Sequence, residues 1–184
     1  AAPERFPAGH FASICGTVIA GRHPQTRRRF TMVEPQMGGW GATQTRDGAN
    51  AQFSSSHGET FNCPVEIAEA RYGFDYRRLS LNDEPGGEGR RRGGRGLVKE
   101  FAIGGPETEI SIGYSRHKQR VWGLAGGAPG TTNRVEIDRG DGNCETYALA
   151  SGLQLATGDV VRIITAQGGG WGSADHGPPE TTAP

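Results

Sequence analysis

Long apolar segments are missing from this chain of 184 residues. Its most apolar stretch, from Val160 to Ile164, is interrupted by Arg162, whereas a membrane-spanning helix needs about 18 consecutive apolar residues. The first residues lack a basic region followed by an apolar one, so we expect no signal peptide and no membrane partner. Only 34% of the residues are hydrophobic, which predicts a thin, loop-rich core.

Cysteine is also scarce. Cys15, Cys63 and Cys144 are far apart and odd in number, and the sequence has no Cys-x-x-Cys pair or Cys/His knuckle. This spacing argues against a disulfide scaffold and against a structural zinc site, so we expect no metal ligands in the chain. A reducing, cytoplasmic location is the default expectation.

Neither sign of charge is in excess, because 20 basic residues balance 20 acidic ones. General nucleic-acid binding depends on neutralising many phosphates, so we expect no nucleic-acid partner. Lysine is nearly absent: apart from Lys99 and Lys118, every basic residue is arginine. Arginine presents a planar fork of donors to carboxylates and phosphates, although a GC-rich genome is the simpler explanation of this bias.

Glycine, in contrast, is abundant, with 31 residues beside 11 prolines. Short β-branched and apolar segments between the glycine clusters predict strands. These segments cover residues 14–20, 29–33, 76–81, 97–103, 109–114, 135–137, 147–149 and 160–165. We expect 97–103 and 109–114 to form a hairpin across Gly104-Gly105-Pro106, and Asn62 to cap a short helix over 64–72.

The predicted fold class is therefore mainly β to α+β, with short antiparallel strands, long Gly/Arg-rich loops and one or two short helices. We expect a single module over residues 1–174, followed by a polar tail at 175–184. The Gly-Gly-Trp-Gly of residues 38–41 recurs at 169–172. We interpret the two copies as glycine turns, each held by a packed tryptophan, and not as two halves of a ligand wall.

The segment 82–96 (NDEPGGEGRRRGGRG) is the strongest local feature. Glycine lets backbone N–H groups approach an anion closely, and arginine adds paired donors. The candidate substrate- or anion-binding residues are Gly86, Gly87, Gly89, Arg90, Arg92, Gly93 and Gly94. The alternatives are a solvated loop whose arginines pair with Glu84 or Glu88, and a segment that binds a nucleic-acid strand.

A second group of candidates lies just upstream of the predicted helix and on it. His57 and Glu59, together with Glu66 and Glu69, place one imidazole and three carboxylates within a short span. Such groups can perform acid/base chemistry or hold a divalent metal, so His57, Glu66 and Glu69 are the catalytic candidates. The alternative is a helix start decorated with carboxylates that its dipole favours.

The order of several motifs resembles the C-terminal part of the hydantoinase B/oxoprolinase subunit family, which contains N-methylhydantoinase, 5-oxoprolinase and the acetone and acetophenone carboxylases. The motifs that carry the resemblance are His23-Pro24, residues 38–42, Asp47-Gly48, the Asn-x-Pro-Val-Glu-x-x-Glu of 62–69, residues 86–94, residues 122–127 and residues 168–172. The chain departs from the family at Glu84-Pro85, where Asp-Ser is common, and at Arg95, where an apolar residue is usual.

The resemblance implies an activity shared between subunits. A partner, the hydantoinase A-type ATP-binding subunit, would activate the substrate by phosphorylation, and the B-type subunit would then hydrolyse a cyclic amide of the hydantoin or oxoproline type. The alternatives are a piece of an ATP-dependent ketone carboxylase and a non-catalytic structural module of either complex.

The family's His- and Asp-containing metal box does not occur in this sequence. ATP and a divalent metal would therefore bind mostly outside this chain, which we expect to be inactive alone and to need the N-terminal part of the B-type subunit as a further partner.

Overall fold

The computed structural model describes residues 2–55, 57 and 60–174, so the expected polar tail at 175–184 lies outside the described residues. In chain order the elements are η1 (Pro3–Arg5, a 3-10 turn), β1 (Cys15–Arg22), β2 (Arg29–Pro35), α1 (Val65–Tyr72), β3 (Phe74–Leu81), β4 (Leu97–Ile103), β5 (Thr108–Tyr114), β6 (Arg134–Asp138), β7 (Cys144–Tyr147), β8 (Leu149–Leu155) and β9 (Val160–Ile164). The expected fold class, mainly β with a short helix, is confirmed.

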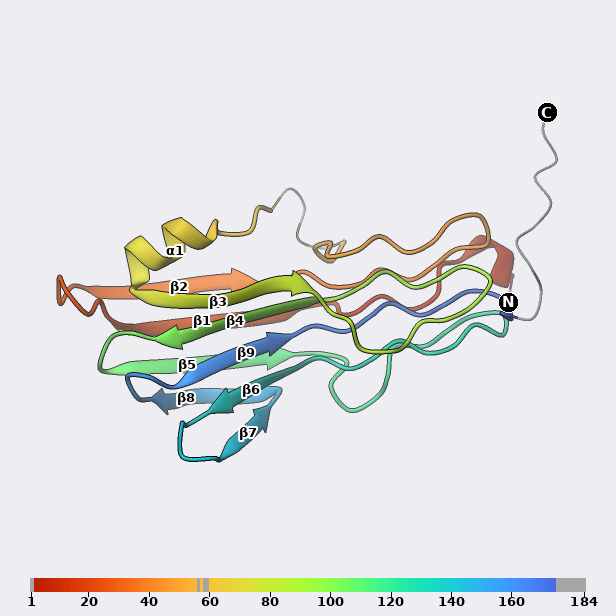
Figure 1. Ribbon diagram of the computed structural model, residues 1–184. Helices are drawn as coiled ribbons and strands as arrows, with labels where there is room; N and C mark the ends of the chain where they lie inside the picture. Colours follow the sequence, from red (N-terminus) through yellow and green to blue (C-terminus); the bar gives the residue numbers. More distant parts are fainter. Residues whose placement is uncertain (1, 56, 58–59, 175–184) are drawn as a thin grey trace.

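The strands form two antiparallel sheets (Figure 1). One sheet has the order β2-β1-β5-β8, and the other has the order β3-β4-β9-β6-β7. Successive side chains of a strand point to opposite faces, so every second residue faces inward. In the first sheet, Ile19 is paired with Met32 on one side and Ile110 on the other. These three side chains share one buried cluster with Phe101 and Ile163 of the second sheet, which makes the pair of sheets a sandwich.

The expected hairpin between residues 97–103 and 109–114 is wrong, although both strands exist. β4 pairs with β3 and β9, whereas β5 pairs with β1 and β8. The connection through Gly104-Gly105-Pro106 thus crosses from one sheet to the other. A hairpin and a change of sheet give the same alternation of apolar residues, because both bury one face of each strand.

The helix α1 is confirmed over Val65–Tyr72 and lies beside β2 and β3 at one end of the sandwich (Figure 1). It ends at Gly73, whose φ of 72° is left-handed and whose N–H donates to the carbonyl of Glu69 at 2.8 Å. The expected cap by Asn62 is wrong: Pro64 precedes the first turn, and no side chain caps it. Within the described residues, no helix is long and apolar enough to cross a membrane.

Beyond the sandwich, extended segments without strand pairing run side by side (Figure 1). We call this region the glycine bundle and define it as residues 8–12, 38–42, 86–96, 121–130 and 166–172. Its central segment, 167–172, is buried throughout. Each segment bonds to several neighbours and not to one: Gly168 N donates to Gly94 O, Gly169 N to Gly9 O, and Gly170 N to Ala128 O, at 2.8 to 3.0 Å.

Glycine is required in the bundle because backbones touch there. A Cβ built on Gly168 would stand 2.0 Å from the carbonyl oxygen of Trp40, and one on Gly39 would stand 2.0 Å from that of Gly94. Such separations are shorter than any real Cβ contact. The two Gly-Gly-Trp-Gly copies are thus packed extended segments and not turns, with the Nε1 of Trp40 bonded to Phe53 O at 2.9 Å.

Candidate functional site

The Arg/Gly segment 82–96 does not form a solvated loop. Gly86, Gly87, Gly93 and Gly94 are buried in the bundle. The N–H of Gly87 donates to Pro129 O at 2.9 Å, that of Gly93 to Gly87 O at 2.8 Å, and that of Gly94 to Trp40 O at 2.8 Å. These N–H groups are used within the chain, so any ligand has to be met by the arginine side chains.

Arg90 and Arg91 pack toward the bundle. The guanidinium carbon of Arg90 lies 4.8 Å from the ring centroid of Trp171, in cation–π geometry. The backbone of Arg91 exchanges two hydrogen bonds with that of Trp171, at 3.0 and 2.9 Å. The Nε atoms of both arginines are buried and have no hydrogen-bond partner within the described part of the chain. Arg90 therefore contributes packing, and Arg92 is the exposed arginine of the run.

A cleft of about 360 Å³ opens beside Arg92. Its lining consists of Asp47, Gly48, Asn50, Leu81, Arg92, Gly93 and Arg95. The backbone N–H of Arg92 donates to Asp47 Oδ1 at 3.0 Å, and that of Arg95 to Asn50 Oδ1 at 2.7 Å, so two side chains fix the path of the loop. The Arg95 guanidinium is paired with Asp83 at 2.7 Å, whereas Arg92 has no ion pair with any described residue.

The structure does not bring His57, Glu66 and Glu69 into one described site. His57 Nδ1 lies 2.8 Å from Ser54 Oγ, Glu69 Oε1 accepts from the Tyr76 N–H at 2.9 Å, and Glu66 is exposed. Glu59 lies outside the described residues. Among the residues that the structure describes, no three His, Cys, Asp or Glu side chains are grouped so as to hold a metal ion.

One buried polar cluster escaped the sequence analysis. Lys99 is 1% exposed and points from β4 into the sandwich, where its Nζ bonds Glu34 Oε2 at 2.6 Å and Asn62 Oδ1 at 3.1 Å. Glu34 Oε1 accepts from the N–H of Cys63 at 3.3 Å. Asn62 therefore holds the segment before α1 onto the two sheets. Lys99 and Glu34 both occupy inward strand positions, and that break in the apolar alternation was the available signal.

The cluster continues toward the first sheet. Gln36 Nε2 lies 3.2 Å from Glu34 Oε2 and 3.3 Å from Thr17 Oγ1, which in turn lies 2.7 Å from the hydroxyl of Tyr114. Burial raises the pKa of the Tyr114 hydroxyl well above its usual value. Burial, together with the charge of Glu34, also raises the pKa of Tyr76. Both phenols are thus neutral, and the Lys99–Glu34 pair carries the only opposite charges in this described cluster.

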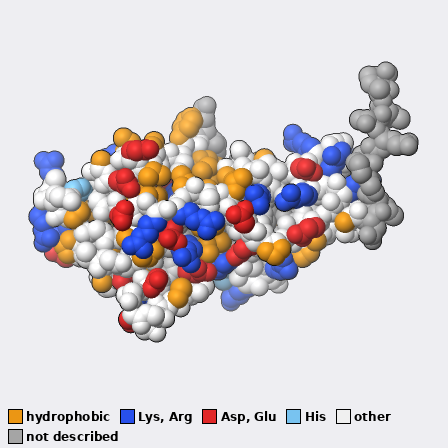
Figure 2. Space-filling view, viewed as in Figure 1, with side chains coloured by type: hydrophobic (Ala, Val, Ile, Leu, Met, Phe, Trp, Pro, Cys, Tyr) orange, Lys and Arg blue, Asp and Glu red, His pale blue; other side chains and the backbone are white. Residues whose placement is uncertain are grey.

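A second set of charges covers the outer face of the five-stranded sheet. Figure 2 shows acidic and basic side chains interspersed across this face. Arg162 bridges Glu100 at 2.5 Å and Glu136 at 3.1 Å, and Arg134 bridges Glu136 at 2.8 Å and also bonds Glu84. The hydrogen bond from Arg134 lowers the pKa of the Glu84 carboxyl. These arginines are neutralised by neighbours and are not free for a ligand.

Comparison with known proteins identifies relatives over nearly all of the chain. The family model described as hydantoinase B/oxoprolinase matches residues 1–174. A putative D-/L-hydantoinase of Pseudomonas sp., in its B-type chain, is 27% identical over 166 residues, which cover 89% of this chain and 28% of that protein. The chain thus spans less than a third of the length of this relative.

Two solved structures share the fold. The nucleotide-free structure of an acetone carboxylase, from work on ATP-dependent acetone carboxylation, superposes with a TM-score of 0.73 at 18% identity, and the match covers 92% of this chain and 27% of that one. An ATP-dependent caprolactamase from Pseudomonas jessenii superposes with a TM-score of 0.70 at 22% identity, covering 94% of this chain and 31% of that one. At these identities the superpositions establish the fold alone.

Proposed function

This chain belongs to the hydantoinase B/oxoprolinase family, and we propose that it forms part of the B-type subunit of an ATP-dependent, multi-subunit enzyme that hydrolyses cyclic amides. The observation that carries the proposal is the match over residues 1–174, together with the Pseudomonas relative named for a hydantoinase. ATP and a divalent metal would bind mostly outside this chain. The described residues contain no grouped metal ligands, which fits a division of labour between chains.

Within that enzyme, we assign the cleft beside Arg92 to a negatively charged substrate group or intermediate. Arg92 is exposed, lines the cleft and has no ion pair with a described residue. Arg95 provides a second guanidinium, and Gly93 leaves the approach open. A fork of charged donors suits a carboxylate or a phosphorylated amide. Because the bundle uses the N–H groups of Gly87, Gly93 and Gly94, these glycines would act by holding Arg92 in place.

The outer face of the four-stranded sheet supports the proposed partnership with the rest of the B-type subunit. Val33 is 70% exposed and Leu149 is 64% exposed, and Val18 lies next to Val33 across β1 and β2. Gly113, on the neighbouring β5, has open space where a Cβ would stand. A flat, apolar sheet face of this kind is usually covered. We propose that the part of the subunit that this chain does not span packs there.

The proposal is tested on the assembled complex of the full B-type subunit with its A-type partner. ADP release and ring opening would be measured with hydantoin, oxoproline and caprolactam, and in parallel with acetone or acetophenone plus bicarbonate. Amide-dependent turnover is the expected result. Turnover with ketone and bicarbonate alone would instead support the carboxylase. ADP release by the isolated chain would contradict the shared site.

The Arg92 assignment has its own test in the same complex. We expect Arg92→Ala to lower kcat/KM at least about tenfold, because charge-assisted hydrogen bonds contribute about 1.5–3 kcal/mol. Arg92→Lys should recover part of the loss, since the charge remains but the fork is gone. Arg77→Ala is the matched control, because Arg77 is also exposed and has no ion pair with a described residue. Equal activity of Arg92→Ala and the parent complex would make this chain a structural module.

The cysteines support a cytoplasmic location as part of the same proposal. All three are free in the structure: Cys15 is buried and Cys144 exposed. An exposed free thiol is typical of proteins kept in a reducing compartment.

A further inference from the structure

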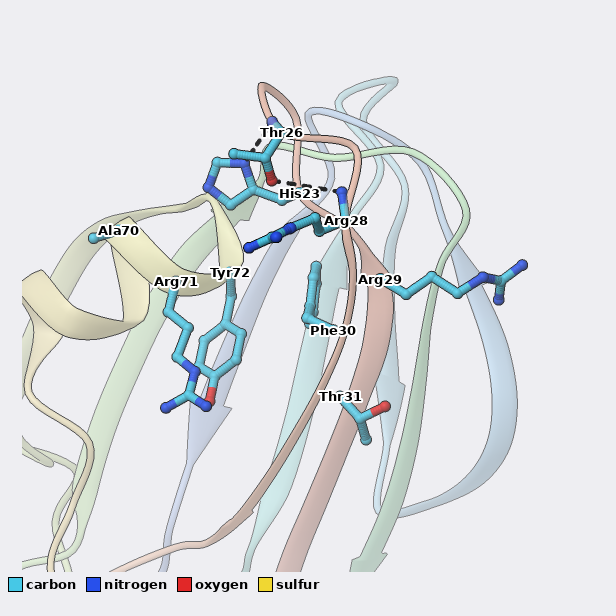
Figure 3. A pocket seen from close by; sticks show the side chains of 9 residues that line it. All are labelled: His23, Thr26, Arg28, Arg29, Phe30, Thr31, Ala70, Arg71 and Tyr72. Carbon is cyan, nitrogen blue, oxygen red and sulfur yellow. Dashed lines mark hydrogen bonds between the residues drawn. The ribbon is translucent and has the colours of Figure 1, made fainter.

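A cavity at the far end of the sandwich is separate from the cleft beside Arg92. It measures about 500 Å³ and lies between the β1–β2 turn and the C-terminal end of α1 (Figure 3). Its lining consists of His23, Thr26, Arg28, Arg29, Phe30, Thr31, Ala70, Arg71 and Tyr72. The volume falls in the range of pockets that hold small molecules.

The charge of the lining points to an anion. The lining residues include three arginines and no aspartate or glutamate. Arg28 and Arg71 have no ion pair with any described residue, whereas Arg22, near the same turn, is paired with Glu107 at 2.7 Å. Figure 2 shows basic side chains gathered at this end of the molecule. The helix dipole accounts for a cation at Arg71, in the last turn of α1, but not for Arg28, which comes from the turn.

The two arginines reach the cavity from opposite walls. In Figure 3 the Arg28 side chain extends from the turn toward the helix, and Arg71 approaches from the helix, while Arg29 points away. The wall of the turn is fixed locally, because His23 Nδ1 accepts N–H bonds from Gln25 and Thr26, each at 3.2 Å. The proton of a neutral His23 ring is therefore on Nε2, which makes that atom a donor.

Aromatic side chains form a rigid floor. Phe30 and Tyr72 have ring centroids 5.3 Å apart, and both contact Phe74, which is 4% exposed and belongs to the core. The floor is thus held by the sandwich and does not depend on a ligand. It offers a flat apolar surface next to the guanidinium groups and the hydroxyl of Tyr72.

We propose that this cavity binds the phosphate group of a small phosphorylated compound. Two guanidinium forks from opposite walls, with hydroxyl groups between them, can surround a tetrahedral dianion, whereas a single carboxylate needs only one fork. The floor of Phe30 and Tyr72 accommodates an apolar or planar part attached to that phosphate. The site does not depend on the proposed amide hydrolysis, since it shares no lining residue with the cleft beside Arg92.

The test is calorimetric titration of the full 184-residue chain at constant ionic strength, with inorganic phosphate, phenyl phosphate and acetate as probes. Inorganic phosphate is expected to bind, phenyl phosphate more tightly because of the aromatic floor, and acetate more weakly than either. Arg28→Ala and Arg71→Ala should each weaken phosphate binding at least about tenfold. Arg77→Ala, which removes an exposed arginine elsewhere, should leave it unchanged.

Other outcomes overturn the assignment. Absence of saturable phosphate binding by the parent chain would exclude the site. An equal loss in Arg77→Ala would reduce the effect to overall charge. Acetate binding as strongly as phosphate would make the cavity a carboxylate site. Circular dichroism on each variant would verify that the fold is retained, as expected for exposed side chains.

Discussion

The sandwich and the glycine bundle exclude water by different means. In the sandwich, side chains such as Ile19 and Phe101 fill the space between two sheets and are fully buried. In the bundle, backbones lie against one another, and the space that a side chain would need is absent at Gly93 and Gly168. A side-chain core can adjust to a change of volume by shifting rotamers, whereas a backbone contact has no rotamer to change. Substitution tolerance should therefore differ sharply between the two regions.

The two regions also differ in what they leave for a ligand. The bundle uses its backbone N–H groups internally, so only side chains at its edge, such as Arg92, remain available. The sandwich has paired most of the arginines on its five-stranded face, and leaves free the pair formed by Arg28 and Arg71 at its end. Candidate binding sites thus lie at the margins of both regions and not in their centres.

The largest expected effect separates the regions directly. A Cβ on Gly93 would stand 1.9 Å from the carbonyl oxygen of Gly168, so Gly93→Ala should cost more than about 4 kcal/mol of unfolding free energy. Gly113→Ala is the matched control in β5, where a Cβ meets nothing within 4 Å. It should be neutral or stabilise the chain by up to about 1 kcal/mol. Chemical denaturation measures both, and a similar loss in the two variants would refute the distinction.

The next largest effect lies inside the sandwich, at its buried ion pair. Lys99→Met should cost about 3–4 kcal/mol, because it leaves the charge of Glu34 buried without its partner. The double variant Lys99→Met with Glu34→Leu should recover most of that loss, since no uncompensated charge remains. Denaturation of both variants gives the comparison. A double variant as unstable as the single one would show that packing, and not charge, limits this site.

Asn62 illustrates where sequence reasoning about the fold stops. Its position before Pro64 and a helical pattern predicts a cap, and the helix is indeed present. The side chain instead bonds Lys99, which is 37 residues away in the sequence. Local rules describe the chain near the residue, but a buried lysine 37 residues further on competes for the same oxygen. That competition depends on how the two sheets meet, which no local pattern contains.

The glycines of segment 82–96 show a similar limit for the candidate site. Their number predicts close backbone approach, and this holds, but what approaches Gly93 is the backbone of Gly168. Composition alone does not distinguish an anion from another part of the chain. Strands, by contrast, could be located from alternation because each buries one face locally, as in β5. Which strand pairs with which was not predictable for β4 and β5, since pairing depends on segments distant in the sequence.

A smaller effect is expected where the bundle joins the sandwich, at Glu84 and Arg134. The pKa of Glu84 is lowered in the folded chain, so its contribution is present above the unfolded value of about 4.3 and is lost as the pH falls through the lower folded value. Because the pair is partly exposed, we expect less than about 1 kcal/mol. Glu84→Gln should flatten the stability curve in this acidic range. An unchanged acid dependence in Glu84→Gln would assign it to other carboxylates.

The smallest effect is kinetic and asks whether the two regions open together. Cys15 is buried, and burial raises the pKa of its thiol, whereas Cys144 is exposed. The thiolate is the reactive form, so iodoacetamide should label Cys144 quickly and Cys15 only when the sandwich opens.

Cys15 shares its buried cluster with Phe11 of the bundle, so loosening the bundle should expose it. Gly89→Ala is a mild bundle variant, because its Cβ would stand 2.8 Å from the Gly172 carbonyl oxygen. We expect it to speed the labelling of Cys15 severalfold, while Gly113→Ala leaves the rate unchanged. Mass spectrometry of the two sites over time measures both rates. If Cys15 stays equally protected in Gly89→Ala while hydrogen exchange shows the bundle open, the regions unfold independently, because side-chain packing alone then holds the sandwich closed.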